Sequence, residues 1–212
     1  NLDRAELCTA LDLGGLTPSL ALTKACSEYL EIHAMVRPRQ GNFNYTPVEV
    51  NLMQQELRAL LQAGATGVVF GCLTPEHDID LEATKALVAK AKTLELCTTF
   101  HRAFDFIPNK SEALETLIDL GFNRILTSGG MATAEQGAEE IKTLVNQANG
   151  RIEIMAGSGV NSQNIPLFNS IGVDAVHFSI RKRGQDQMGL GMGVSYDIDP
   201  NKIESILTAI KA

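Results

Sequence analysis

The residues best suited to chemistry lie in one short run, where a histidine, a cation and a carboxylate follow a strand-like segment. His101, Arg102 and Asp105 come directly after the β-rich residues 97–100. This combination suits acid–base catalysis or the polarisation of a bound substrate, and we predict catalytic roles for His101 and Asp105 with Arg102 as a ligand-binding residue. Side chains alternate along a strand, so not every member of the run can face one site. The alternative is that His101 is a buried structural residue.

Two further cations follow another strand-like segment, residues 31–36. Arg37 and Arg39 flank Pro38, which forces an extended backbone before it and ends the hydrogen-bonded ladder. Both guanidinium groups should therefore emerge at the end of the strand, where they favour a carboxylate or phosphate ligand. The alternative is a pair of surface arginines that form ion pairs with glutamates.

Small, glycine-rich turns follow the two strand-like segments 124–126 and 152–155. Such turns expose backbone N–H groups that can hold an oxyanion or a phosphate. In α/β barrels the phosphate site usually lies in the loops after the last two strands. We therefore predict an anion site from these turns and the strand end that follows them, at Ser128, Gly157, Ser158, Gly159 and His177. The alternative is that glycine simply permits a sharp turn at these places.

The first strand-like segment, residues 5–8, carries Glu6 and Cys8 on one side and Leu7 on the other. Glu6 is predicted to act as a general base or as a counter-charge to the arginines. Cys8 is the candidate metal ligand, because Cu(I) prefers thiolate and thioether donors. A Cu(I) site needs at least one further soft donor near Cys8.

The remaining cysteines give weak support for a metal site. Cys72 and Cys97 lie at or near strands and could converge with Cys8, whereas Cys26 falls in a predicted helix. No CxxC pair or zinc-type spacing occurs. We expect reduced, mostly buried thiols and no complete Cu(I) site in this chain. Residues 188–193 contain two methionines but are better interpreted as a glycine-rich loop.

Seven short β-rich runs alternate with amphipathic helical segments. The predicted strands are residues 5–8, 31–36, 67–70, 97–100, 124–126, 152–155 and 175–178. A repeat of roughly 30 residues indicates parallel strands joined by crossover helices. No nucleotide-type glycine loop follows the first strand, which disfavours a doubly wound sheet. Polar residues at nearly every strand end favour a TIM-like (β/α)₈ barrel. The count is one strand short, so we expect the first βα unit to be missing from this chain.

Composition limits the remaining possibilities. The chain has 212 residues with 18 Lys and Arg against 25 Asp and Glu, a net charge of −7, and 44% hydrophobic residues. This composition excludes disorder and argues against nucleic-acid binding. No linker divides residues 1–212, so we predict one domain.

No segment resembles a membrane span or signal peptide, so we predict a cytoplasmic protein that binds no membrane. Unpaired strand edges in an incomplete barrel favour a homo-oligomer.

Long motifs occur in a fixed order along nearly the whole chain. They comprise residues 4–8, 13–19, 35–39, 67–74, 99–105, 125–130, 155–160 and 177–179. In sequence and order these motifs resemble those of the CutC copper homeostasis family, with residues 99–105 the most specific.

The resemblance implies a TIM-like barrel in the cytoplasm and a link to copper tolerance. A Cu(I) site suggested for this family lies around cysteines on the first two strands. Cys8 matches the second of them, and the first would lie in the strand that this sequence lacks. Two functions therefore stay open: Cu(I) binding or handling through Cys8, or an enzyme or sensor for a small phosphorylated or carboxylated metabolite.

Overall fold

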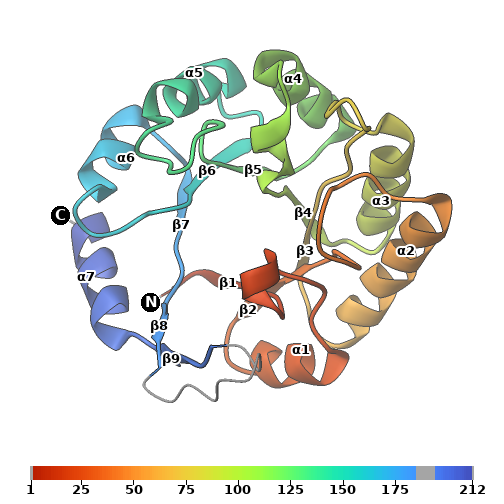
Figure 1. Cartoon of the computed structure of the whole chain (residues 1–212), viewed down its shortest axis with the longest axis horizontal. Helices are drawn as coiled ribbons and strands as arrows, with labels where there is room; N and C mark the ends of the chain where they lie inside the picture. Colours follow the sequence, from red (N-terminus) through yellow and green to blue (C-terminus); the bar gives the residue numbers. More distant parts are fainter. Residues whose placement is uncertain (1, 185–193, 212) are drawn as a thin grey trace.

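The computed structural model describes residues 2–184 and 194–211, and it shows a curled parallel sheet inside a ring of helices (Figure 1). The run 188–193 lies outside the described residues. The seven strands of the sheet pair in chain order, each parallel to the next. They are β1 (Arg4–Leu7), β2 (Glu31–Met35), β3 (Gly67–Phe70), β4 (Cys97–Phe100), β5 (Arg124–Thr127), β6 (Glu153–Gly157) and β7 (Ala175–His177). The predicted TIM-like α/β fold is confirmed, with seven strands rather than the eight of a complete barrel.

Helices cover the outer face of the sheet (Figure 1). They are α1 (Leu20–Ser27), α2 (Pro47–Gln62), α3 (Leu81–Thr93), α4 (Lys110–Leu120), α5 (Ala138–Ala148), α6 (Ile165–Ile171) and α7 (Pro200–Lys211). Local sequence sets their ends: α2 begins with a capping box between Thr46 and Glu49, with Pro47 in its first turn. In the described ranges, no helix combines the length and apolar character needed to cross a bilayer.

Two short 3₁₀ helices follow strand ends, η1 (Leu11–Leu13) after β1 and η2 (Arg102–Phe106) after β4. A small antiparallel hairpin, β8 (Arg181–Arg183) with β9 (Tyr196–Ile198), was not predicted. Its strands have only three residues and are largely exposed, so no apolar alternation marks them. The hairpin is tied to η1 because Arg181 and the hydroxyl of Tyr196 both bind Asp12, at 3.0 and 2.9 Å.

The core lies between the strands and the helices. Phe70 on β3 and Phe100 on β4 are fully buried, and both pack on Phe122, with ring centroids 5.3 and 5.5 Å apart. Leu114 and Leu117 of α4 are buried in the same cluster. The end of β4 is therefore held by a packed core, and His101 follows it directly.

Charged side chains meet at the amino-terminal ends of the strands. Arg124 at the start of β5 is 2% exposed, and it donates to Glu153 at 2.6 Å and to the hydroxyl of Thr99 at 3.2 Å. Arg4 also approaches Glu153, and the buried His33 binds Glu31. These groups satisfy one another, so this end of the ring holds a structural ion-pair network.

The packing at β4 predicts that two aromatic substitutions differ greatly in their effect on the free energy of unfolding. Phe100→Ala should lower the free energy of unfolding by about 3–5 kcal/mol, because it leaves a cavity in the core. Tyr29→Ala should change it by no more than about 0.5 kcal/mol, because Tyr29 is 86% exposed. Urea denaturation measures both, and equal losses would contradict this description of the core.

Candidate functional site

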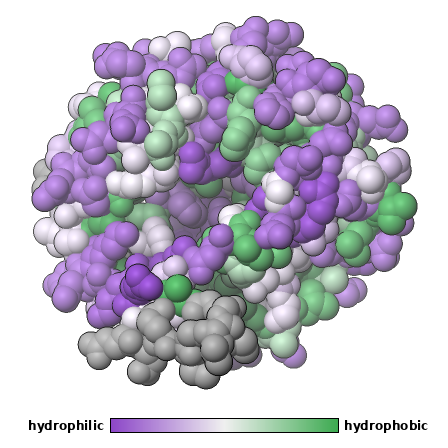
Figure 2. All heavy atoms as spheres, viewed as in Figure 1, coloured by the Kyte–Doolittle hydropathy of each residue, from purple (hydrophilic) through white to green (hydrophobic). Residues whose placement is uncertain are grey.

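A cavity of about 440 Å³ lies at the carboxyl ends of the strands. We call it the mouth cavity, and Figure 2 shows a hollow at the centre of the ring with hydrophilic surface around it. The structure brings six of the predicted site residues to its wall, namely Glu6, His101, Arg102, Ser158, Gly159 and His177. Its volume is in the range of small-molecule sites.

His101 is buried in this wall and held in one orientation. Its Nδ1 accepts a hydrogen bond from the backbone N–H of Ala103 at 3.2 Å, and its ring packs against Phe43 with centroids 4.8 Å apart. Gly71 makes room for the ring, since a Cβ there would lie 2.7 Å from Nδ1. Because Nδ1 is the acceptor, the proton of the neutral ring is on Nε2. That atom is buried and has no partner among the described residues.

Burial of the ring, together with the smaller effect of the nearby Arg37 guanidinium, lowers the pKa of His101 from 6.5 to about 3. The ring is therefore neutral at physiological pH. The predicted acid–base role of His101 stays a prediction, and in this state the ring holds its proton on Nε2.

Glu6 reaches the cavity from β1, where it pairs in register with His33 of β2. One carboxylate oxygen, Oε2, is buried and has no partner in the described part of the chain. Glu6 also raises the pKa of Cys8, although burial of the thiol is the larger cause, and together they bring it to about 12. Glu6 Oε2 and His101 Nε2 are thus two buried polar atoms without a partner among the described residues.

Arg37 does not line the cavity, contrary to its predicted role as an anion ligand. Its buried guanidinium donates to the backbone carbonyls of Leu13, Gly15 and Gly41, at 3.0, 3.2 and 2.8 Å. These bonds fasten the loops after β1 and β2. Arg37 therefore supports the wall of the cavity and is already occupied by carbonyl oxygens.

Arg39 also lies outside the cavity lining. It forms an ion pair with Glu49 at the start of α2, donates to the carbonyl of Asn44 at 2.6 Å, and lies over the ring of Tyr45. The alternative left open by the sequence, an arginine paired with a glutamate, describes this residue.

The turn after β5 is an anion site that the chain fills itself. The Asp105 carboxylate accepts bonds from the Thr127 hydroxyl at 2.6 Å, the N–H of Ser128 at 2.9 Å and the N–H of Gly130 at 3.1 Å. Arg102 donates to the same carboxylate at 2.7 Å. Asp105 and Ser128 thus lie outside the cavity lining, and Arg102 lines it with a guanidinium that is already paired. The structure therefore places Asp105 in the turn after β5 and not in the cavity with Glu6 and His101.

The turn after β6 differs because no carboxylate of residues 2–184 or 194–211 accepts a hydrogen bond from its backbone. Ser158 and Gly159 both have positive φ, 85° and 76°, which is a strained conformation for serine. The Ser158 hydroxyl donates to the carbonyl of Ala132, and no described residue accepts from the N–H groups of residues 158–160. Gly157 itself packs against Leu126 and lies outside the lining. This turn can therefore donate backbone hydrogen bonds to an anion.

Two cations at the cavity were missed by the sequence analysis, Arg181 of β8 and Lys202 of α7. Arg181 forms an ion pair with Asp12, whereas the ammonium group of Lys202 has no ion pair within the described ranges. A basic triplet at residues 181–183, soon after His177, was the available signal for Arg181. Lys202 had no local signal, because only the fold brings α7 to the strand ends.

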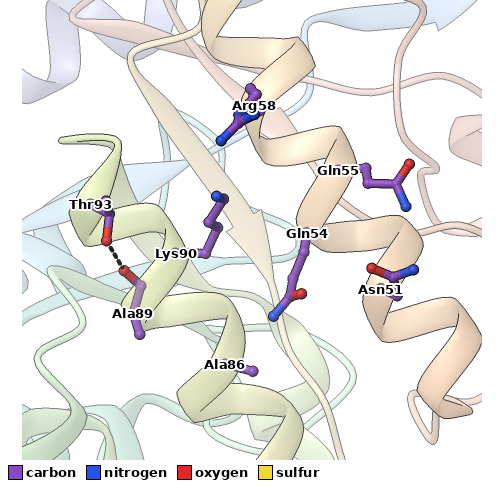
Figure 3. Close-up of a pocket in the computed structure, with 8 residues that line it drawn as sticks. All are labelled: Asn51, Gln54, Gln55, Arg58, Ala86, Ala89, Lys90 and Thr93. Atoms are coloured by element: carbon purple, nitrogen blue, oxygen red, sulfur yellow. Dashed lines mark hydrogen bonds between the residues drawn. The ribbon is translucent and has the colours of Figure 1, made fainter.

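A second cavity of about 450 Å³ lies on the outside of the ring, in a groove between α2 and α3 (Figure 3). Arg58 and Gln54 of α2 and Lys90 of α3 line it. It contains no strand-end residue and no buried unpaired group of the described chain. The mouth cavity is therefore the candidate functional site.

Cys8, the candidate metal ligand, lies near one other residue that carries a sulfur atom, Met35. Its Sγ and the terminal methyl of Met35 lie 3.3 and 3.5 Å from the point where a Cβ on Gly15 would be. The two side chains therefore approach the same point, and the raised thiol pKa keeps Cys8 protonated. In residues 2–184 and 194–211, no cluster of three or more His, Cys, Asp or Glu side chains could hold a metal.

The fold and the cavity define a class, a TIM-like α/β barrel with a polar site at the carboxyl ends of its strands. Sequence comparison identifies the family, since a model of the CutC family matches residues 1–182. A CutC family protein of Bacteroides fragilis is 42% identical over 99% of this chain and 85% of its own length. One from Vibrio atlanticus is 41% identical over 99% of this chain and 91% of its own length. The chain belongs to the CutC family.

Comparison with solved structures supports the same family and fold. A CutC protein from Streptococcus agalactiae, named for copper homeostasis, superposes with a TM-score of 0.79 and 35% identity. The match covers 83% of this chain and 88% of that chain. A 3-hexulose-6-phosphate synthase superposes with a TM-score of 0.63 and 15% identity, over 99% of this chain and 87% of that chain. At that identity the second match shows the fold alone.

The lowered pKa of His101 predicts acid sensitivity. Between pH 6.5 and about 3 the unfolded chain binds a proton that the folded ring does not, so the free energy of unfolding falls as the pH falls. One such proton contributes a slope of about 1.4 kcal/mol per pH unit. In His101→Gln this contribution should vanish, which urea denaturation at pH 7, 6, 5 and 4.5 can measure. An unchanged slope would show that the imidazole is protonated in the folded protein.

Proposed function

We propose that this CutC chain binds a small phosphorylated or carboxylated metabolite in the mouth cavity. The observation that carries the proposal is the turn after β6, where no described residue accepts from the N–H groups of residues 158–160. Lys202, which has no ion pair within the described ranges, lines the same cavity. Free N–H groups beside an ammonium group can bind a phosphate or a carboxylate.

The charge distribution favours an anionic ligand. Lys202, Arg181 and His177 line the cavity beside the backbone N–H groups of the turn at residues 158–160. This local positive potential lies in a protein whose net charge is −7. Cations and free N–H groups in one concave site attract phosphate or carboxylate. The turn also lies after the penultimate strand of the sheet, close to the usual phosphate position of α/β barrels.

Phosphate should therefore stabilise the protein through Lys202. At a concentration 100 times the dissociation constant, a ligand stabilises the folded state by about 2.7 kcal/mol. For a chain of this size, that is a rise in Tm of roughly 5–10 °C. We expect this shift in the wild type and in Lys90→Ala, the matched control in the outer groove, and its loss by more than half in Lys202→Ala. Equal shifts in all three proteins, measured by thermal melts with added phosphate, would contradict the proposal.

Cu(I) binding is a second candidate, favoured by the approach of Cys8 and Met35 to the same point above Gly15. The name of the Streptococcus agalactiae relative links that protein to copper homeostasis. Binding to Cys8 must displace the thiol proton, and the high pKa makes that displacement unfavourable near neutral pH. We infer that Cu(I) binds this chain only weakly.

An anaerobic titration against a competing Cu(I) chelator tests this inference. We expect weak binding at pH 7 that changes little in Cys8→Ser. Any contribution from Cys8 should strengthen about tenfold for each pH unit, because one proton leaves the thiol on binding. Tight one-to-one binding at pH 7 that Cys8→Ser abolishes would make copper the better account of the site.

We also propose that the protein is cytoplasmic. Its single domain would form a homo-oligomer. The four free cysteines suit a reducing compartment, and the acidic composition disfavours nucleic acid as a partner. Oligomerisation would cover the outer strands β1 and β7, which share no ladder with each other among the described residues.

A further inference from the structure

We propose that the ligand of the mouth cavity is a phosphate monoester whose body is an aromatic or other apolar group, rather than a polyhydroxylated chain. The turn after β6 and Lys202 hold the phosphate, and the side chains of Phe178 and Phe43 contact the body. The inference rests on the proposed binding of an anionic metabolite and adds to it the class of group that carries the phosphate.

The first support is the apolar part of the cavity wall. It is formed by Met35, Phe43, Leu126, Val160 and Phe178. Met35, Leu126 and Val160 are almost fully buried, so they close the wall and offer little surface. Phe43 and Phe178 are only half-buried, so apolar surface in the wall stays in contact with water. An apolar ligand that covers this surface gains free energy in proportion to the area removed from water.

The second support is the position of Phe178 beside the open turn. Strands β6 and β7 are neighbours in the sheet, and Gly157 pairs in register with His177. Ser158 and Phe178 directly follow these paired residues, so the aromatic residue comes from the strand end next to the turn. Val160, at the end of the same turn, also lines the cavity. A phosphate on this turn therefore leaves its ester group next to apolar side chains.

The third support is that most polar groups in the described wall are already occupied. Arg102 and Arg181 each form an ion pair with a carboxylate, and the Ser158 hydroxyl donates to a backbone carbonyl. The unpaired atoms Glu6 Oε2 and His101 Nε2 have almost no accessible surface. Few polar atoms are therefore left for the hydroxyl groups of a ligand. A polyhydroxylated body would lose hydrogen bonds to water without replacing them, which costs binding free energy.

An aromatic ring matches these features better than a flexible apolar chain. A ring is rigid, so it loses little conformational freedom on binding, and it packs on a phenylalanine ring in an offset or edge-to-face arrangement. The cavity volume of about 440 Å³ is in the range of sites for small organic molecules. The phosphate then supplies the charge recognition, and the apolar wall selects the body.

The experiment compares three phosphate monoesters that share one anionic group and differ in their bodies, by isothermal titration calorimetry. They are methyl phosphate, phenyl phosphate and glycerol 3-phosphate. We expect phenyl phosphate to bind at least about tenfold more tightly than methyl phosphate, because its ring buries apolar surface. Glycerol 3-phosphate should bind within about threefold of methyl phosphate, because its hydroxyl groups find few partners.

Variants of Phe178 test where the body lies. Phe178→Ala should weaken phenyl phosphate at least about fivefold more than methyl phosphate, because only the first ligand covers the ring. Phe178→Leu keeps apolar surface and most of the volume, so it should retain part of the preference and guards against misfolding of the alanine variant. Tyr29→Ala removes an aromatic side chain that is 86% exposed and outside the lining, and it should keep the full preference. Thermal melts confirm that each variant is folded.

The outcomes separate this inference from the proposed function. Binding of inorganic phosphate and methyl phosphate with no preference for phenyl phosphate would overturn the inference and leave the proposed function standing. So would tighter binding of glycerol 3-phosphate than of phenyl phosphate, or a full preference for phenyl phosphate in both Phe178 variants. Failure of inorganic phosphate and of all three monoesters to bind would overturn both.

Discussion

The site depends on one hydrogen bond, from the backbone N–H of Ala103 to Nδ1 of His101. It exists because β4 ends at Phe100 and the chain turns at once into η2, which brings the N–H group back over the ring. The bond places the imidazole proton on Nε2, and burial beside Arg37 keeps the ring neutral. The bond therefore fixes the orientation of one side chain in the wall of the cavity.

Two similar glycine turns have different roles because of a tertiary contact. Asp105 reaches the turn after β5 and fills it with a carboxylate, which makes that turn structural. In the described part of the chain no carboxylate accepts from the turn after β6, where Ser158 has a strained backbone. The chain thus shows that these turns accept oxyanions, and it leaves open the turn at the usual phosphate position of the fold.

The sequence could predict the strands, because short β-rich apolar runs and glycine turns are local signals. Two strands, β3 and β4, occupy their predicted residues, and the others differ by at most about two residues at an end. It could also predict that Glu6, His101 and Ser158 lie together, since parallel strands place their carboxyl ends at one edge. It could not predict that Arg37 is occupied by three carbonyls or that Lys202 arrives from α7, because both depend on packing between segments far apart in sequence.

The most direct test of this account is the protonation state of the His101 ring in solution. A long-range ¹H–¹⁵N correlation spectrum of the ¹⁵N-labelled protein distinguishes a protonated from an unprotonated ring nitrogen. The account predicts an unprotonated Nδ1 and a protonated Nε2 at pH 7, with no change down to pH 5, assigned by loss of the signals in His101→Gln. A proton on Nδ1, or titration of the ring near pH 6.5, would contradict it.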